Sequence, residues 1–235
     1  MAATEETLST PADRGALGNS WIPYVVPMAA FFIFTMFEPH GREQYPYFYI
    51  LKIALVTVFL IMFRKPLTDI RFEARLLVPA VLVGAAVFGE WIWLQPLTHY
   101  PHFAFLGKRV EYNPFVSIDN SLLRACFLVA RFYGLVVLVP IVEEIFWRSF
   151  LLRFLTDPDD FKRLRIGEFS WVAFSAVALA FGMAHPEWLE AVLCAVAYGL
   201  LLRQTKSLFA CVVAHGVTNL MLGIYVVTQH AWKFW

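Results

Sequence analysis

The stretch PIVEEIFWRSF, residues 140–150, places two adjacent glutamates and an arginine inside a long apolar run. The run extends from Ser121 to Leu155, more than enough chain to cross about 30 Å of hydrocarbon as a helix. An ionisable side chain at the centre of a membrane helix costs roughly 3 kcal/mol unless it is paired, hydrated or close to the interface. The three ionisable groups therefore require a structural or chemical explanation.

The composition of the whole chain indicates a membrane protein. Of its 235 residues 60% are hydrophobic, and the mean hydropathy is +0.62, whereas soluble domains are roughly half apolar. We predict an all-α, polytopic transmembrane bundle of about seven to eight helices with a buried polar centre. The apolar runs begin near Trp21, Tyr47, Leu76, Ser121, Ser170, Trp188 and Leu208.

The domain organisation follows from these runs. Residues 1–20 are small and polar and lack the basic segment and apolar core of a signal peptide, so we expect a flexible N-terminal tail. Residues 21–235 are expected to form a single transmembrane domain. The fourth run suits one long tilted helix or two segments broken at Pro140. A net charge of +1 without a basic stripe argues against nucleic-acid binding.

The distribution of Lys and Arg over the connections predicts the orientation, because cytoplasmic loops carry the positive excess. If the fourth run crosses once, eleven basic residues fall on the side of the N-terminus and four on the other side. We therefore expect an integral membrane protein with a cytoplasmic N-terminus and an external C-terminus. The eleven are Arg14, Arg64, Lys65, Arg71, Arg75, Arg153, Lys162, Arg163, Arg165, Arg203 and Lys206.

Several polar or reactive residues have simple structural explanations. His99 and His102 lie in the longest connection, residues 95–120, which is typical of an interfacial loop and only weakly suggests a metal site. The C-terminal sequence WKFW, residues 232–235, suits an interfacial anchor. Five further ionisable residues within the apolar runs are expected to reach the interface or to pair across helices: Lys52, Glu90, Arg124, Arg131 and Glu190.

Glu143, Glu144 and Arg148 differ from these because of their spacing. Glu144 and Arg148 are four residues apart, so a helix stacks them on one face in the favourable order for a salt bridge. Glu143 is rotated by about 100° and lacks that partner. An unpaired buried carboxylate beside water can act as a general base, although one structural ion network would also explain all three residues.

Two later segments add polar groups at helical spacing. Phe181 and His185 lie one turn apart, and His215 and Asn219 share one face of the last run. Counted from the cytoplasmic ends at 1.5 Å per residue, Glu143, His185 and Asn219 lie at roughly 17 to 22 Å, and His215 lies at roughly 10 Å. Three helices are thus expected to bring these groups to similar depth.

These three motifs, in this order and on separate apolar helices, resemble the CPBP family of intramembrane proteases, which includes the CAAX prenyl endopeptidases. The resemblance covers Ser121 to Trp235, the expected catalytic core. The segments EEIFWRSFLLRF and RQTKSLFACVVAHGVTNLMLGIYVV further resemble an exosortase-associated, CAAX protease-related branch. The motif residues are Glu143, Glu144, Arg148, Phe181, His185, His215 and Asn219.

The resemblance implies a glutamic-type intramembrane endopeptidase that needs no metal or other cofactor. Glu143 would activate a water with help from His185, and His215 with Asn219 would stabilise the oxyanion. Glu144 and Arg148 would hold the helix and tune Glu143. The implied partners are a peptide or protein substrate of unknown identity, prenylated or not, membrane lipids and a protein-sorting machinery.

Four alternatives stay open. Two His and two Glu could ligate zinc in a membrane peptidase, although no HExxH motif is present and Arg148 would oppose a dication. Cys211 and His215 are four residues apart and could form a thiol peptidase, although cysteine is a common apolar filler. The chain could also be a non-catalytic scaffold in a protein-sorting or secretion system, or a transporter, although no repeats support a transporter.

Overall fold

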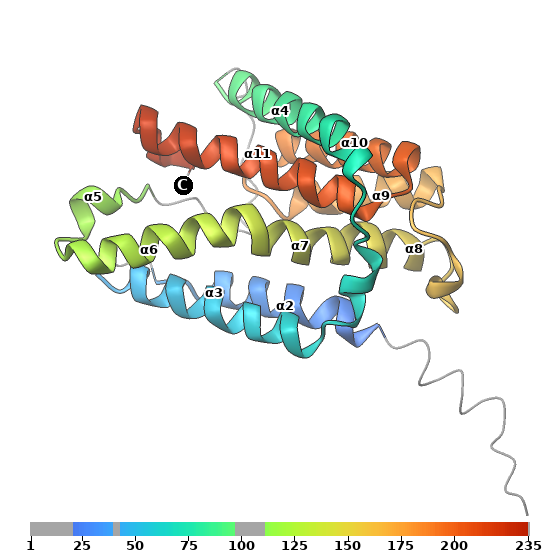
Figure 1. The fold of residues 1–235 in the computed structure, drawn as a ribbon, viewed down its shortest axis with the longest axis horizontal. Helices are drawn as coiled ribbons and strands as arrows, with labels where there is room; N and C mark the ends of the chain where they lie inside the picture. The colour runs from blue at the N-terminus through green and yellow to red at the C-terminus, as the bar shows by residue number, and fades with distance from the viewer. Residues whose placement is uncertain (1–20, 40–42, 97–110, 235) are drawn as a thin grey trace, which may run out of the picture.

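The computed structural model describes residues 21–39, 43–96 and 111–234 (Figure 1). Within these ranges the regular secondary structure is entirely helical, which confirms the all-α prediction. The expected N-terminal tail, residues 1–20, lies outside the described residues. His99, His102 and most of the expected interfacial loop lie outside them as well.

Seven long helical segments correspond to the seven apolar runs. Six of them are α2 (Ile22–Met36), α3 (Tyr45–Met62), α4 (Leu77–Leu94), α9 (Trp171–Met183), α10 (Trp188–Thr205) and α11 (Leu208–Gln229). The seventh is continuous from Ser121 to Phe154 and comprises α6 (Ser121–Tyr133), η4 (Gly134–Leu138), α7 (Val139–Glu144), η5 (Ile145–Leu151) and α8 (Leu152–Phe154). Short helices are η1 (Lys65–Asp69), η2 (Ala74–Leu76), α5 (Pro114–Ser117), η6 (Phe161–Arg163) and η7 (Trp232–Phe234).

Four helices of the described chain are long and apolar enough to cross a membrane. They are Tyr45–Met62, Ala74–Leu94, Ser121–Phe154 and Leu208–Gln229. Helices α2 and α9 are apolar but shorter, with 15 and 13 residues. The protein is therefore an integral membrane protein, and the crossing of the membrane by all seven segments stays a prediction.

Pro140 does not break the long helix, so the two-segment alternative is wrong. The helix contains 34 residues, about 50 Å at the rise of an α-helix, which exceeds the hydrocarbon thickness. Two stretches, η4 and η5, have π-helical hydrogen bonding and lie on either side of α7. The wider turn of η4 precedes Pro140 directly and accommodates a residue that lacks a backbone N–H.

The long helix divides the bundle into two parts. Figure 1 shows α6, α7 and α8 across the middle, with α2 and α3 on one side and α11 with α4, α9 and α10 on the other. Helix α11 packs on α4, on η4 and on α7, while α2 contacts η5 and α3 contacts α6. The segment that carries Glu143 and Glu144 is therefore enclosed by helices from both halves of the chain.

A glycine allows α11 to approach the long helix closely. A Cβ at Gly216 would lie 2.8 Å from the carbonyl oxygen of Val136 in η4. Residue 136 is four positions before Pro140, so its carbonyl has no N–H to accept from in α-helical register. The close contact at Gly216 positions His215, the preceding residue, against α7.

Candidate active site

The acidic pair lies at the end of α7 and is enclosed by protein. Glu143 and Glu144 are 5% and 0% exposed, and Arg148 in η5 is 2% exposed. Nη1 of Arg148 donates to Oε1 of Glu144 at 3.1 Å. The ion pair expected from the four-residue spacing is therefore confirmed.

Glu144 has a second partner that the sequence did not predict. Nδ1 of His215, on α11, lies 3.0 Å from the same Oε1 atom. An ionised carboxylate only accepts hydrogen bonds, so Nδ1 carries the hydrogen and Nε2 is the other functional nitrogen of the ring. Glu144 thereby connects α7 with α11 and fixes the orientation of His215, as carboxylates orient functional histidines in other sites.

Glu143 is buried but, unlike Glu144, accepts no hydrogen bond from a described residue. Its Oε2 atom is buried and has no hydrogen-bond partner among the described residues. The charges of His215, Glu144 and Arg148 lie within electrostatic range of its carboxylate. Glu143 therefore faces the polar interior of the bundle and does not face lipid.

More buried polar atoms without a partner occur in the same stretch of the long helix as Glu143. Within the described residues, Oε2 of Glu144, Nε1 of Trp147 and Nη2 of Arg148 are also buried without a hydrogen-bond partner. Buried polar atoms in proteins almost always have partners, and clusters of exceptions mark places where water or a ligand binds. Residues 143–148 of the long helix thus contain two buried acceptor atoms and two buried donor atoms that a water molecule or a ligand could satisfy.

His185 follows the end of α9 and is joined to the ion pair through Phe181. The two rings stack with centroids 4.5 Å apart, and Nδ1 of His185 lies 2.8 Å from the carbonyl oxygen of Phe181. Because a carbonyl only accepts, Nδ1 carries the hydrogen. The guanidinium of Arg148 lies 4.6 Å from the centroid of the same Phe181 ring, a cation–π contact.

Asn219 lies one turn beyond His215 and binds the long helix. Its Nδ2 donates to the carbonyl oxygen of Leu135 at 2.9 Å. In the π-helical register of η4 that carbonyl would accept from residue 140, a proline without an N–H. Asn219 therefore supplies the hydrogen bond that Pro140 cannot, and its second Nδ2 hydrogen makes no hydrogen bond to a described residue.

Tyr198 of α10 is a site residue that was not predicted from the sequence. Its ring lies 5.4 Å from the ring of His215, and its hydroxyl donates to Thr218 at 2.7 Å. Arg148 lies 5.6 Å from the Tyr198 centroid. A tyrosine within an apolar helix is unremarkable in sequence, so no sequence feature distinguishes it.

The metal and thiol alternatives gain no structural support. The part of the chain that the structure describes contains no group of three or more His, Cys, Asp and Glu residues arranged to hold a metal ion. The thiol of Cys211 donates to the carbonyl of Tyr198 at 3.4 Å. Cys211 and Cys194 are buried among apolar residues, whereas Cys126 is exposed.

The remaining buried ions differ in part from expectation. Lys52 is 3% exposed and pairs with Glu38, which follows the end of α2, and its reach to the interface stays a prediction. Arg124 donates to the carbonyl of Ile118 beyond the helix end at 3.1 Å, as expected for a residue near the interface. Arg131 contacts the hydroxyl of Tyr45 across helices at 3.4 Å.

Glu90 and Glu190 lie on two helices that pack against each other. The two acids, on α4 and α10, are within electrostatic range of each other. Both carboxylate oxygens of Glu90 are buried and have no hydrogen-bond partner among the described residues. An ion pair for Glu90 is therefore not found in the described structure.

Comparison with known families assigns the segment that contains these residues. Residues 125–221 match the family model described as type II CAAX prenyl endopeptidase Rce1-like. This segment, called the Rce1-like segment below, is similar to the type II CAAX prenyl endopeptidases. The Rce1-like segment covers less than half of the 235 residues but contains all three motifs, from Glu143 to Asn219.

The match confirms the resemblance noted in the sequence. Association with an exosortase system stays a prediction. No curated protein and no solved structure matches the chain significantly. The Rce1-like segment includes the long helix from Ala125 onward, α9, α10 and most of α11, the elements that supply the candidate site.

Proposed function

We propose that the protein is an intramembrane endopeptidase in which Glu143 activates a water molecule for attack on a peptide bond. The Rce1-like segment supports a CAAX-type peptidase with a peptide substrate in a membrane environment. The observation that carries the proposal is the buried Oε2 of Glu143, which has no hydrogen-bond partner among the described residues, next to Glu144, which is hydrogen-bonded to His215. A general base requires such a carboxylate within reach of a water and a substrate.

The proposed reaction uses the two acids differently. Glu143 takes a proton from water, the resulting hydroxide bonds to the scissile carbonyl carbon, and the carbonyl oxygen becomes an oxyanion. Glu143 then returns the proton to the leaving amine as the C–N bond breaks, so that one water and one peptide bond yield a carboxylate and an amine. Glu144 keeps its place because its Oε1 accepts from both Arg148 and His215.

The donors for the oxyanion come from α11. Nε2 of His215 points away from Glu144, and donation from it requires the doubly protonated ring, whose positive charge Glu144 balances. Asn219 has one Nδ2 hydrogen beyond the one used on Leu135. Preorganised donors of this kind contribute about 3 kcal/mol each to transition-state stabilisation.

His185 is proposed to assist at the water. With Nδ1 donating to the carbonyl of Phe181, the lone pair of the neutral ring lies on Nε2. Stacking on Phe181 restricts the ring plane. His185 would then accept a hydrogen bond from the water that Glu143 deprotonates.

The experiment that tests this function does not require a known substrate. Peptide termini in membranes and culture medium are compared by quantitative mass spectrometry for cells with wild-type protein, Glu143→Gln or Glu90→Gln. New termini should disappear with Glu143→Gln and persist with Glu90→Gln, because the glutamine side chain cannot accept the proton. If Glu143→Gln leaves every terminus and every cellular phenotype unchanged, a non-catalytic scaffold explains the chain better.

A further inference from the structure

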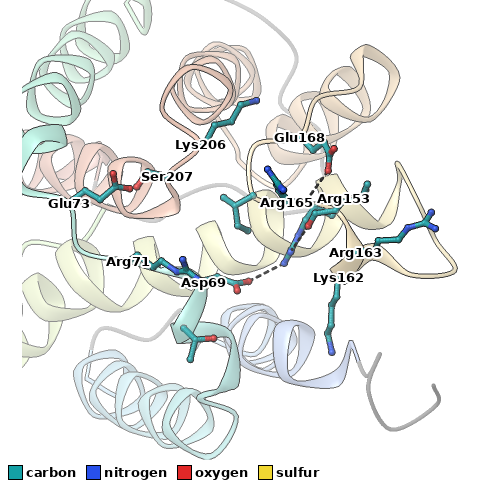
Figure 2. Close-up of a pocket in the computed structure, with 13 residues that line it drawn as sticks. Asp69, Arg71, Glu73, Arg153, Lys162, Arg163, Arg165, Glu168, Lys206 and Ser207 are labelled. Carbon is teal, nitrogen blue, oxygen red and sulfur yellow. Dashed lines mark hydrogen bonds and ion pairs between the residues drawn. The ribbon is translucent and has the colours of Figure 1, made fainter. Parts of the chain in front are cut away.

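A second polar site lies at one end of the bundle, separate from the candidate active site. It is a pocket of about 640 Å³ where helices end or begin (Figure 2). It is lined by residues of η1, by the connections before α4 and α9, and by the turn from α10 to α11. None of Glu143, His185, His215 and Asn219 lines it. The volume is within the range of about 300 to 1,000 Å³ for pockets that bind small molecules.

The lining of this pocket is positively charged. It contains six cationic and three acidic residues. The six cationic residues are Arg71, Arg153, Lys162, Arg163, Arg165 and Lys206. They come from four separate parts of the chain, and Figure 2 shows them around one space.

All three carboxylates of the pocket are already engaged. Asp69 pairs with Arg153 at 3.0 Å and accepts from Ser149 at 2.5 Å. Glu73 pairs with Arg75 at 2.8 Å, and Glu168 accepts from the backbone N–H of Arg165 at 2.9 Å. The negative groups of the pocket are therefore committed to neighbouring donors.

Two of the cations are not neutralised in this way. The guanidinium groups of Arg71 and Arg165 make no hydrogen bond or ion pair with any residue that the structure describes. Arg153 is 5% exposed, so the pocket also includes a buried cation. Desolvation, followed by the positive charges of Lys65 and Arg153, lowers the pKa of Lys162. The pocket therefore has an excess of positive charge that attracts an anion.

The position of the pocket agrees with the level of lipid headgroups. Phe72, the residue after Arg71, is 73% exposed and contacts Phe209 at the start of α11. Trp171, the first residue of α9, is 63% exposed, and the guanidinium of Arg203 lies 5.3 Å from its ring. Exposed aromatic residues beside Arg and Lys at helix ends are typical of the membrane interface.

We propose that this pocket binds the phosphate group of an anionic ligand, with Arg71 and Arg165 as its primary contacts. Planar guanidinium groups match the geometry of phosphate oxygens and form charge-assisted hydrogen bonds with them. The position at the helix ends favours the headgroup of an anionic phospholipid, since basic clusters adjoining membrane helices recognise such lipids. A soluble phosphate compound shares the same chemistry.

Binding of the lipid is measured in nanodiscs by native mass spectrometry. This measurement does not depend on peptide cleavage. Wild-type protein is placed in equal mixtures of phosphatidylcholine and phosphatidylglycerol, and the lipids that remain bound after release are counted. The pocket variant is Arg71→Gln/Arg165→Gln. The control is Arg64→Gln/Arg203→Gln, which removes two exposed arginines at the same end that do not line the pocket.

Wild-type protein and the control should retain phosphatidylglycerol, and the pocket variant should bind it about tenfold more weakly or worse, as loss of two charge-assisted contacts requires. Addition of inorganic phosphate distinguishes a phospholipid headgroup from a soluble phosphate compound as the ligand. Displacement of the lipid by millimolar phosphate indicates a soluble phosphate compound, and resistance to phosphate indicates the lipid headgroup. Equal binding by both double variants would overturn the proposal, as would absence of lipid and phosphate binding by the wild-type protein.

Discussion

Nδ1 of His215 lies 3.0 Å from Oε1 of Glu144, across 71 positions of sequence. The same oxygen accepts from Arg148, so one carboxylate connects an arginine of its own helix with a histidine of α11. The second acid of the pair is thus held through Oε1, although its Oε2 has no partner, whereas the first acid accepts no hydrogen bond from a described residue. This difference assigns separate tasks to adjacent residues of identical chemistry.

Replacement of Glu144 by glutamine should impair the orientation of His215. The neutral amide removes the negative charge that pairs with Arg148 and that holds Nδ1 of His215. We expect kcat to fall at least about tenfold with little change in KM, because the partner that orients a functional histidine is lost. Steady-state kinetics on a cleaved peptide would check this, and a wild-type kcat would show that Glu144 does not position His215.

Replacement of Arg148 should mainly affect stability. Methionine preserves much of the apolar volume but leaves Glu144, which is 0% exposed, without its cation. Removal of one partner of a buried ion pair costs about 3–5 kcal/mol. Unfolding in mixed micelles should show this loss, and Arg148→Met/Glu144→Gln should recover part of it. A double variant whose loss equals the sum of the two single losses would mean that the pair is not energetically coupled.

The contact at Gly216 provides a prediction with a matched control. Alanine at this position would place its Cβ 2.8 Å from the carbonyl oxygen of Val136, which forces α11 away from η4. We expect a loss of about 1–3 kcal/mol in the free energy of unfolding, together with reduced activity, since His215 is the neighbouring residue. Gly89→Ala in α4 meets no atom within 4 Å and should be neutral or stabilising by up to about 1 kcal/mol.

The thiol alternative is tested by Cys211→Ala. Cys211 is 0% exposed and its thiol contacts the backbone of Tyr198, so we expect cleavage to continue at the wild-type rate within about twofold. The same assay in the presence of a strong chelator tests the zinc alternative. Activity lost to the chelator and restored by added zinc would contradict a mechanism that depends on Glu143 and water alone.

Much of the helical architecture could be predicted from the sequence because it depends on local properties. Apolar runs of sufficient length define the helices, and the four-residue spacing of Glu144 and Arg148 defines their ion pair. The contact of Glu144 with His215 could not be predicted in this way. It depends on how α11 packs against α7, which is determined by shape complementarity at positions such as Gly216.

Pro140 also shows that contacts between helices cannot be predicted from local sequence. Its presence alone suits either a break or a continuous helix, and the outcome depends on whether other groups satisfy the carbonyls that lose a partner. The π-helical turn of η4 lies next to Pro140 and changes which carbonyl loses its partner. The amide of Asn219 then donates to the carbonyl of Leu135, 84 positions away in the sequence. The polar spacing of His215 and Asn219 was visible in the sequence, but the role of Asn219 toward Leu135 was not.

The most direct test of the proposed mechanism follows oxygen from water into the product. Purified protein in proteoliposomes is given a peptide identified by the comparison of termini, in water enriched in oxygen-18. The wild-type protein and Glu90→Gln should release a product whose new carboxylate contains the heavy isotope, and Glu143→Gln should release no product above background. Cleavage by Glu143→Gln at the wild-type rate would contradict the assignment of Glu143 as the base that activates water.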